Sequence, residues 1–68
     1  MPSKQIKLSE EQAKFLNFVY HSNTFHIHEP SFFVVHDIRS KGYYEESDRP
    51  MLHELRKRFG AAWIKRLH

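Results

Sequence analysis

Basic residues gather toward the C-terminal end of the chain, at spacings that would suit contacts with phosphate groups. Residues 49–68 hold six Lys or Arg and one acidic residue, whereas residues 1–48 hold five basic and seven acidic residues. The six are Arg49, Arg56, Lys57, Arg58, Lys65 and Arg66. This charge asymmetry is typical of proteins with an acidic partner, most often nucleic acid. A solvated helix face gives the same composition, so the sequence favours a small basic DNA-binding regulator and leaves the second interpretation open.

Two predicted helices, over residues 31–41 and 48–59, resemble a helix-turn-helix in outline. The second helix of that motif reads base edges with Asn, Gln or Arg near its N-terminus. Here that position offers Arg49 and His53 beside Pro50, and the connecting segment is long and acidic. The sequence therefore predicts phosphate contacts and assigns no base-contacting residues.

Three of the six histidines, His21, His26 and His28, lie close enough in sequence to suggest a metal site, since imidazole is a common zinc ligand. The chain has no Cys, so any metal would need His and carboxylate ligands. An isolated His-x-His lacks the four-ligand pattern of a zinc site. We expect hydrogen-bonded surface histidines, no metal and no cofactor.

Catalysis has one candidate pair in the sequence, His36 and Asp37, because a carboxylate can orient an imidazole. Neighbours in sequence point in different directions on a helix or a strand, however. No glycine-rich phosphate loop or Cys nucleophile is present, and a chain this short has little room for a walled pocket. The sequence predicts binding without enzyme activity.

Tyr43 and Tyr44, next to Glu45 and Glu46, form the second candidate site. Tyr is enriched at protein interfaces, so these rings would suit a protein-binding module or inhibitor that docks through an aromatic surface. The alternative is a turn whose rings cover the edge of the core. Trp63 is predicted to belong to the core.

The first helix has the clearest local signal. Ser9 and Gln12 stand three residues apart, as in a capping box, and Leu8 precedes them. Apolar residues from Ala13 onward then recur on one face, and the helix is predicted to end near His21.

Two interpretations compete for the next segment. Residues 24–28 alternate apolar and polar side chains, as a half-buried strand does. Residues 31–41 then form either a helix capped by Ser31 and ended by Gly42, or a strand over 32–36 that pairs with 24–28. The helix is favoured, since Gly42 stands where a stop is needed.

The last helix is predicted to follow a loop over residues 43–48, with Ser47 or Asp48 as its cap and Pro50 in its first turn. Its apolar residues recur at spacings of three and four; they are Leu52, Leu55, Phe59, Trp63 and Leu67. A break at Gly60 stays open, because an interior Gly costs about 1 kcal/mol relative to Ala.

The whole chain has 68 residues, ten of them aromatic, which is enough for one small core without disulfides. We expect a single, mainly α domain of three or four helices over residues 1–68, with residues 1–7 flexible. A short β-hairpin, or an α+β fold, stays open. The N-terminus has no apolar signal run and no stretch suits a bilayer, so a cytoplasmic protein without a membrane partner is expected.

Overall fold

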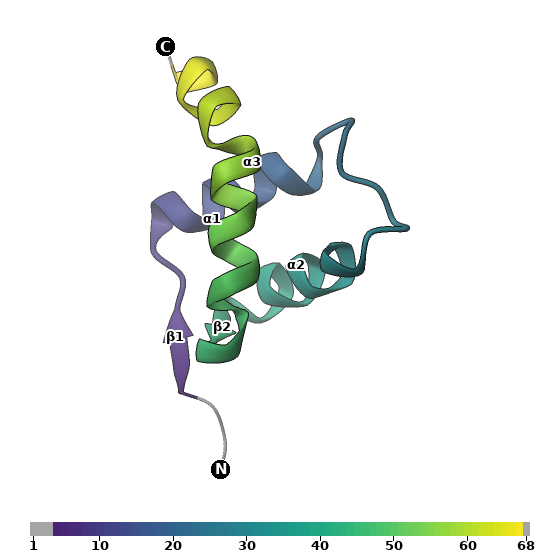
Figure 1. Cartoon of the computed structure of the whole chain (residues 1–68). Helices are drawn as coiled ribbons and strands as arrows, with labels where there is room; N and C mark the ends of the chain where they lie inside the picture. Colours follow the sequence, from purple (N-terminus) through teal and green to yellow (C-terminus); the bar gives the residue numbers. More distant parts are fainter. Residues whose placement is uncertain (1–3, 68) are drawn as a thin grey trace.

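The computed structural model describes residues 4–67, and these residues form a mainly helical domain. In chain order the elements are β1 (Gln5–Lys7), α1 (Glu10–Tyr20), α2 (Pro30–Lys41), β2 (Tyr43–Glu45), the 3₁₀ turn η1 (Glu46–Asp48) and α3 (Arg49–Leu67). Figure 1 shows α3 crossing in front of α1, while the connection between α1 and α2 swings out to one side. The expected mainly α fold with three helices is confirmed.

The capping box at the start of α1 is confirmed. The Ser9 side chain accepts the Gln12 backbone N–H at 3.1 Å, and the Gln12 side chain accepts the Ser9 backbone N–H at 3.1 Å. The helix ends at Tyr20, as expected. Its buried face carries Phe15, Leu16 and Val19.

The strand predicted over residues 24–28 is wrong: this segment consists of turns and irregular chain. Phe25 is buried in the core, but Ile27, which the alternating pattern would place beside it, is 56% exposed. A strand needs a partner, and the proposed partner segment is helical. The Glu29 carboxylate instead accepts the backbone N–H of His26, which closes a turn.

The helical interpretation of the next segment is confirmed, and the strand over 32–36 is wrong. The helix α2 begins with Pro30 in its first turn and Glu29 as its N-cap, so Ser31 is not the cap. Pro suits this position because its missing N–H has no helical partner there. Gly42 ends α2 in the left-handed region at φ 85°, with its N–H donated to the Ile38 carbonyl at 2.8 Å.

The loop predicted over residues 43–48 is wrong. Residues 43–45 are β2, which pairs antiparallel with β1 so that Ile6 stands opposite Tyr44, and residues 46–48 are η1. Two helices separate these strands in the chain, so they do not form a hairpin. Of the segment 1–7, which was expected to be flexible, residues 5–7 form β1 and residues 1–3 lie outside the described residues.

The last helix, α3, continues without interruption through Gly60, which settles the alternative that the sequence left open. Pro50 lies in its first turn, as predicted. Asp48, one of the two residues predicted to cap this helix, instead accepts the backbone N–H of Glu45 at 3.1 Å within the capping box of η1, whose N-cap is Glu45. The buried face of α3 carries Leu55, Phe59 and Trp63.

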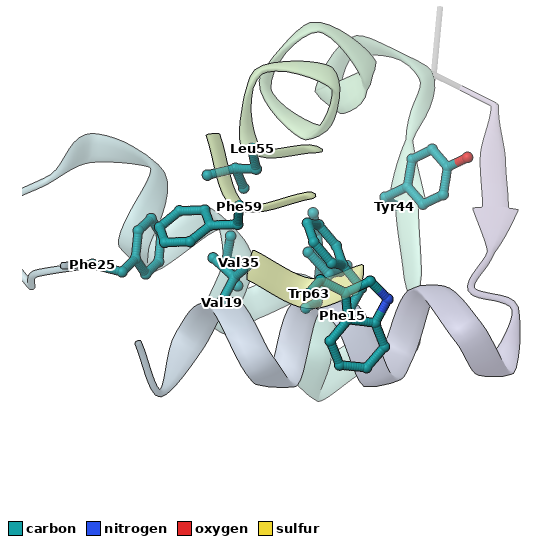
Figure 2. Packing of buried hydrophobic residues seen from close by; sticks show 10 residues of the cluster. Phe15, Val19, Phe25, Val35, Tyr44, Leu55, Phe59 and Trp63 are labelled. Carbon is teal, nitrogen blue, oxygen red and sulfur yellow. The ribbon is translucent and has the colours of Figure 1, made fainter. Parts of the chain in front are cut away.

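The core is built from all three helices together with β2 and the α1–α2 connection (Figure 2). Its buried members are Phe15, Leu16, Val19, Phe25, Val35, Ile38, Tyr44, Leu55, Phe59 and Trp63. Trp63 is 8% exposed, which confirms its predicted place in the core. Its ring meets Phe15 edge-on at 6.0 Å between centroids and Phe18 at 5.4 Å, spacings typical of packed aromatic pairs.

Candidate nucleic-acid interface

The six basic residues predicted to contact phosphates do not share one face of α3. An α-helix turns about 100° per residue, so Arg56 and Arg58 flank the buried stripe on opposite sides and Lys57 points away from it. All six are exposed. The helix therefore offers cations in several directions rather than one continuous basic surface.

Carboxylates already face four of these six cations. Arg49 lies 3.6 Å from Glu46, and Lys57 lies 3.8 Å from Glu54. Across the fold, Arg56 lies 3.6 Å from Glu11 of α1 and its guanidinium carbon stands 4.4 Å from the centre of the Phe15 ring. Each of these ion pairs lowers the positive potential that a phosphate would meet.

Arg58 makes three hydrogen bonds to the α1–α2 connection. Its guanidinium donates to both carboxylate oxygens of Glu29, one of them at 3.1 Å, and to the Thr24 carbonyl at 2.6 Å. These bonds tie the α1–α2 connection to α3. Hydrogen bonds from Arg58 and then from the His26 backbone hold the pKa of Glu29 below its ordinary value. Arg58 thus stabilises the packing of the α1–α2 connection against α3.

A different set of residues surrounds an open groove of about 600 Å³ between the C-terminal half of α1 and the last turns of α3. We call it the α1–α3 groove. It is lined by Lys14, Asn17, Phe18, His21, Ser22, Asn23, Trp63 and Arg66. None of these residues is acidic, and α3 carries no acidic residue after Glu54.

Two cations stand at the α1–α3 groove. The Arg66 guanidinium carbon lies 5.6 Å from the centre of the Phe18 ring. Lys14 lies 3.3 Å from Glu10, one turn back on α1, but both side chains are mostly exposed and such a pair is weak. Lys65, next to Arg66, meets no carboxylate within ion-pair distance among residues 4–67. At this end of α3, neither Lys65 nor Arg66 is paired with a carboxylate of residues 4–67.

Of the predicted phosphate-binding residues, only Arg66 lines the α1–α3 groove. The sequence interpretation missed the contribution of α1. A signal for it was present, because Lys14, Asn17 and His21 recur at spacings of three and four, which places them on one side of α1. The sequence pattern indicates only that Lys14 and Asn17 face away from the apolar stripe of the helix, and it suggests His21 only as a possible metal ligand.

The tyrosines predicted to bind protein do not form an exposed aromatic surface. Tyr44 is 7% exposed and belongs to the core, while Tyr43 is half-buried with the Lys41 ammonium 4.9 Å from its ring centre. This arrangement matches the alternative in which the rings cover the edge of the core. The large apolar side chains that are exposed are Ile27, Phe33, Ile64 and Leu67.

The structure shows no metal-binding cluster among residues 4–67 and places the side chains of His36 and Asp37 against different partners. No group of three or more His, Asp or Glu among residues 4–67 could hold a metal ion. The His36 ring stacks against Tyr20 at 5.7 Å, whereas Asp37 pairs with Lys41 at 2.7 Å. Asp37 is thus engaged away from its neighbour.

Comparisons of the chain with protein-family models, curated proteins and solved structures found no match. Within residues 4–67, no helix combines the length and the apolar character that crossing a bilayer requires. The residues of the α1–α3 groove are therefore the basis for a functional assignment.

Proposed function

We propose that this protein binds nucleic acid through the α1–α3 groove, without catalysis and without sequence specificity. The observation that supports the proposal is the chemistry of the groove lining. Lys14 and Arg66 supply positive charge, Ser22 and Asn23 supply neutral hydrogen-bond donors, and no lining residue is acidic. Lys and Arg with polar side chains are the groups that contact phosphates in nucleic-acid complexes.

Binding of this kind is weak and depends strongly on salt. Two or three phosphate contacts release two or three counterions, which gives a slope of about −2 in a plot of log affinity against log salt. Arg49, Arg56, Lys57 and Arg58 add little, because each of them already faces a carboxylate.

The lack of sequence specificity follows from the outward face of α3. Base edges in a DNA groove are read most often by Arg, Lys, Asn or Gln side chains that point away from the protein. The residues of α3 that face away from the core include His53, Lys57 and Ile64, and Lys57 is near Glu54. The helix α3 contains no Asn or Gln, and the Lys57 ammonium on this face already lies 3.8 Å from Glu54.

A salt titration of binding to a labelled oligonucleotide tests the proposal. We expect measurable affinity at about 50 mM salt that falls steeply as salt rises. Lys14→Gln and Arg66→Gln should each weaken binding and reduce the salt slope by about 0.7 to 0.9. Arg49→Gln is the matched control: it removes the same charge at the opposite end of α3 and should leave the slope unchanged.

The proposal fails if micromolar protein shows no binding at about 50 mM salt. It also fails if Arg49→Gln weakens binding as much as Arg66→Gln, because the effect would then come from net charge alone.

Protein binding is the second candidate function, and the last turns of α3 favour it. Ile64 is 58% exposed and Leu67 is 63% exposed, and together with Gly60 and Ala61 they border a shallow apolar groove. Under the first proposal, the double variant Ile64→Gln, Leu67→Gln should bind nucleic acid as the wild type does. A loss of binding in this variant would place the interface on the apolar side of α3.

A further inference from the structure

The α1–α3 groove has an aromatic wall as well as basic side chains. Phe18 is half-buried and Trp63 is almost fully buried, with 5.4 Å between their ring centres and 50° between their planes. Both residues line the groove. The Phe18 ring is thus partly exposed at the groove, with Trp63 packed against it and the Arg66 guanidinium over it, and an aromatic ring in such a setting can stack with a nucleobase.

The polar residues stand at positions that suit the backbone of a stacked nucleotide. Arg66, with its guanidinium carbon 5.6 Å from the Phe18 ring centre, comes from α3, while Lys14 and His21 come from α1. Proteins that bind single strands combine an aromatic platform for bases with a positively charged groove that follows the phosphates. Base stacking does not require a particular base, which agrees with binding that lacks sequence specificity.

A duplex would not use this arrangement. Its bases are stacked inside a convex cylinder whose surface is phosphate and sugar, so none can reach a ring recessed between two helices. A groove of about 600 Å³ lies in the size range that encloses one small ligand-sized group. A single strand can place one base there without breaking base pairs.

From these observations we infer that the α1–α3 groove binds single-stranded nucleic acid, with one base stacked on Phe18 and the adjoining phosphates near Lys14 and Arg66. This inference rests on the proposed nucleic-acid function and specifies the form of nucleic acid. Stacking is the contribution that separates it from simple phosphate binding.

The chain contains one Trp, and that residue lines the groove, so its fluorescence reports on occupancy. The experiment titrates wild-type protein with a thymidine oligomer of about 12 nucleotides, and separately with its duplex, at about 50 mM salt. We expect the single strand to quench Trp63 fluorescence and to bind at least about tenfold more tightly than the duplex, as one stacked base contributes.

Phe18→Leu removes the platform and keeps an apolar side chain. It should weaken single-strand binding by about 5- to 150-fold, which corresponds to one stacked base, and leave any duplex binding unchanged. Phe18→Tyr keeps the ring and should bind as the wild type does. Phe33→Leu is the matched control, since Phe33 is 59% exposed on α2 outside the groove.

The possible outcomes separate the two proposals. Duplex binding equal to or tighter than single-strand binding overturns the inference and leaves the nucleic-acid function standing. Absence of binding to both ligands overturns both. Circular dichroism shows whether Phe18→Leu is folded. If it is not, the affinities of the wild type for the two ligands and the affinity of Phe18→Tyr still test the inference. Weak single-strand binding by folded Phe18→Tyr would contradict stacking.

Discussion

At the scale of single residues, Arg58 shows that a charge pattern does not reveal which groups a basic side chain contacts. Its place in a basic run favours phosphate contacts, but its guanidinium bonds Glu29 and the Thr24 carbonyl instead. These partners precede it by 29 and 34 residues, so no local pattern could reveal them. The type of a charged residue was readable from the sequence, whereas its partner depended on the fold.

The Glu29–Arg58 contact predicts a pH-dependent contribution to stability. The folded-state pKa of Glu29 is lowered by Arg58, so the stabilisation is fully present above the ordinary Glu pKa of about 4.3. It is lost as pH falls through the lower folded-state value. Glu29→Gln should therefore reduce the melting temperature at pH 7, and the gap to wild type should narrow as the pH falls through the lowered pKa of Glu29.

The control for that measurement is Glu54→Gln, which removes an exposed carboxylate 3.8 Å from Lys57 on the same helix. Surface pairs of this kind contribute little, so the control should melt close to the wild type. A gap between Glu29→Gln and wild type that does not narrow as the pH is lowered from 7 into the acid range would contradict the role of the ionised carboxylate.

At the scale of elements, local signals predicted helix ends and failed for strands. The Ser9 and Gln12 capping box and the Gly42 stop are encoded within a few residues, and both are present. The strands β1 and β2 have three residues each, and two helices separate them in the chain. Three residues are too few for an alternation of apolar and polar side chains to be recognised in the sequence. Residues 24–28 do alternate apolar and polar side chains, but no strand pairs with them, so they do not form a strand.

Gly60 lies in the interior of α3, where an added methyl group would be tolerated. A Cβ at this position would meet only the Cδ of Arg56, at an ordinary contact distance of 3.9 Å. Gly60→Ala should therefore raise the free energy of unfolding by about 0.5 to 1 kcal/mol, measured by urea denaturation. Gly42→Ala is the contrasting control: at φ 85° it should lower that free energy by about 1 to 2 kcal/mol. Destabilisation by Gly60→Ala would show that α3 is not a regular helix there.

At the scale of the whole molecule, the sequence predicted the class of fold and the core residue Trp63, but only part of the candidate site. The α1–α3 groove exists because α3 crosses α1 and brings Arg66 close to Phe18 (Figure 1). Helical spacing indicates which residues share a side of one helix, but not which sides of two helices meet. Lys14 and Asn17 were therefore visible as a polar face and not as part of a site.

Trp63 joins α3 to α1 through Phe15 and Phe18, so its removal should affect the entire domain. Trp63→Ala should cost about 3 to 5 kcal/mol, comparable to the total stability expected of a small domain, and leave the chain largely unfolded. Trp63→Phe should cost much less, since the indole N–H is buried and has no acceptor among the described residues. Circular dichroism melts compare the two variants. A folded Trp63→Ala variant would contradict a structural role for this ring.

The pairing of β1 with β2 also has a consequence for how the chain folds. Lys7 stands opposite Tyr43, so this small sheet closes a loop that contains all of α1 and α2. Closing such a loop costs chain entropy, and the hydrogen bonds of only three residue pairs offset little of that cost. The hydrogen bonds within each helix are local and need no such loop, so we expect the pairing of β1 with β2 to form late in folding.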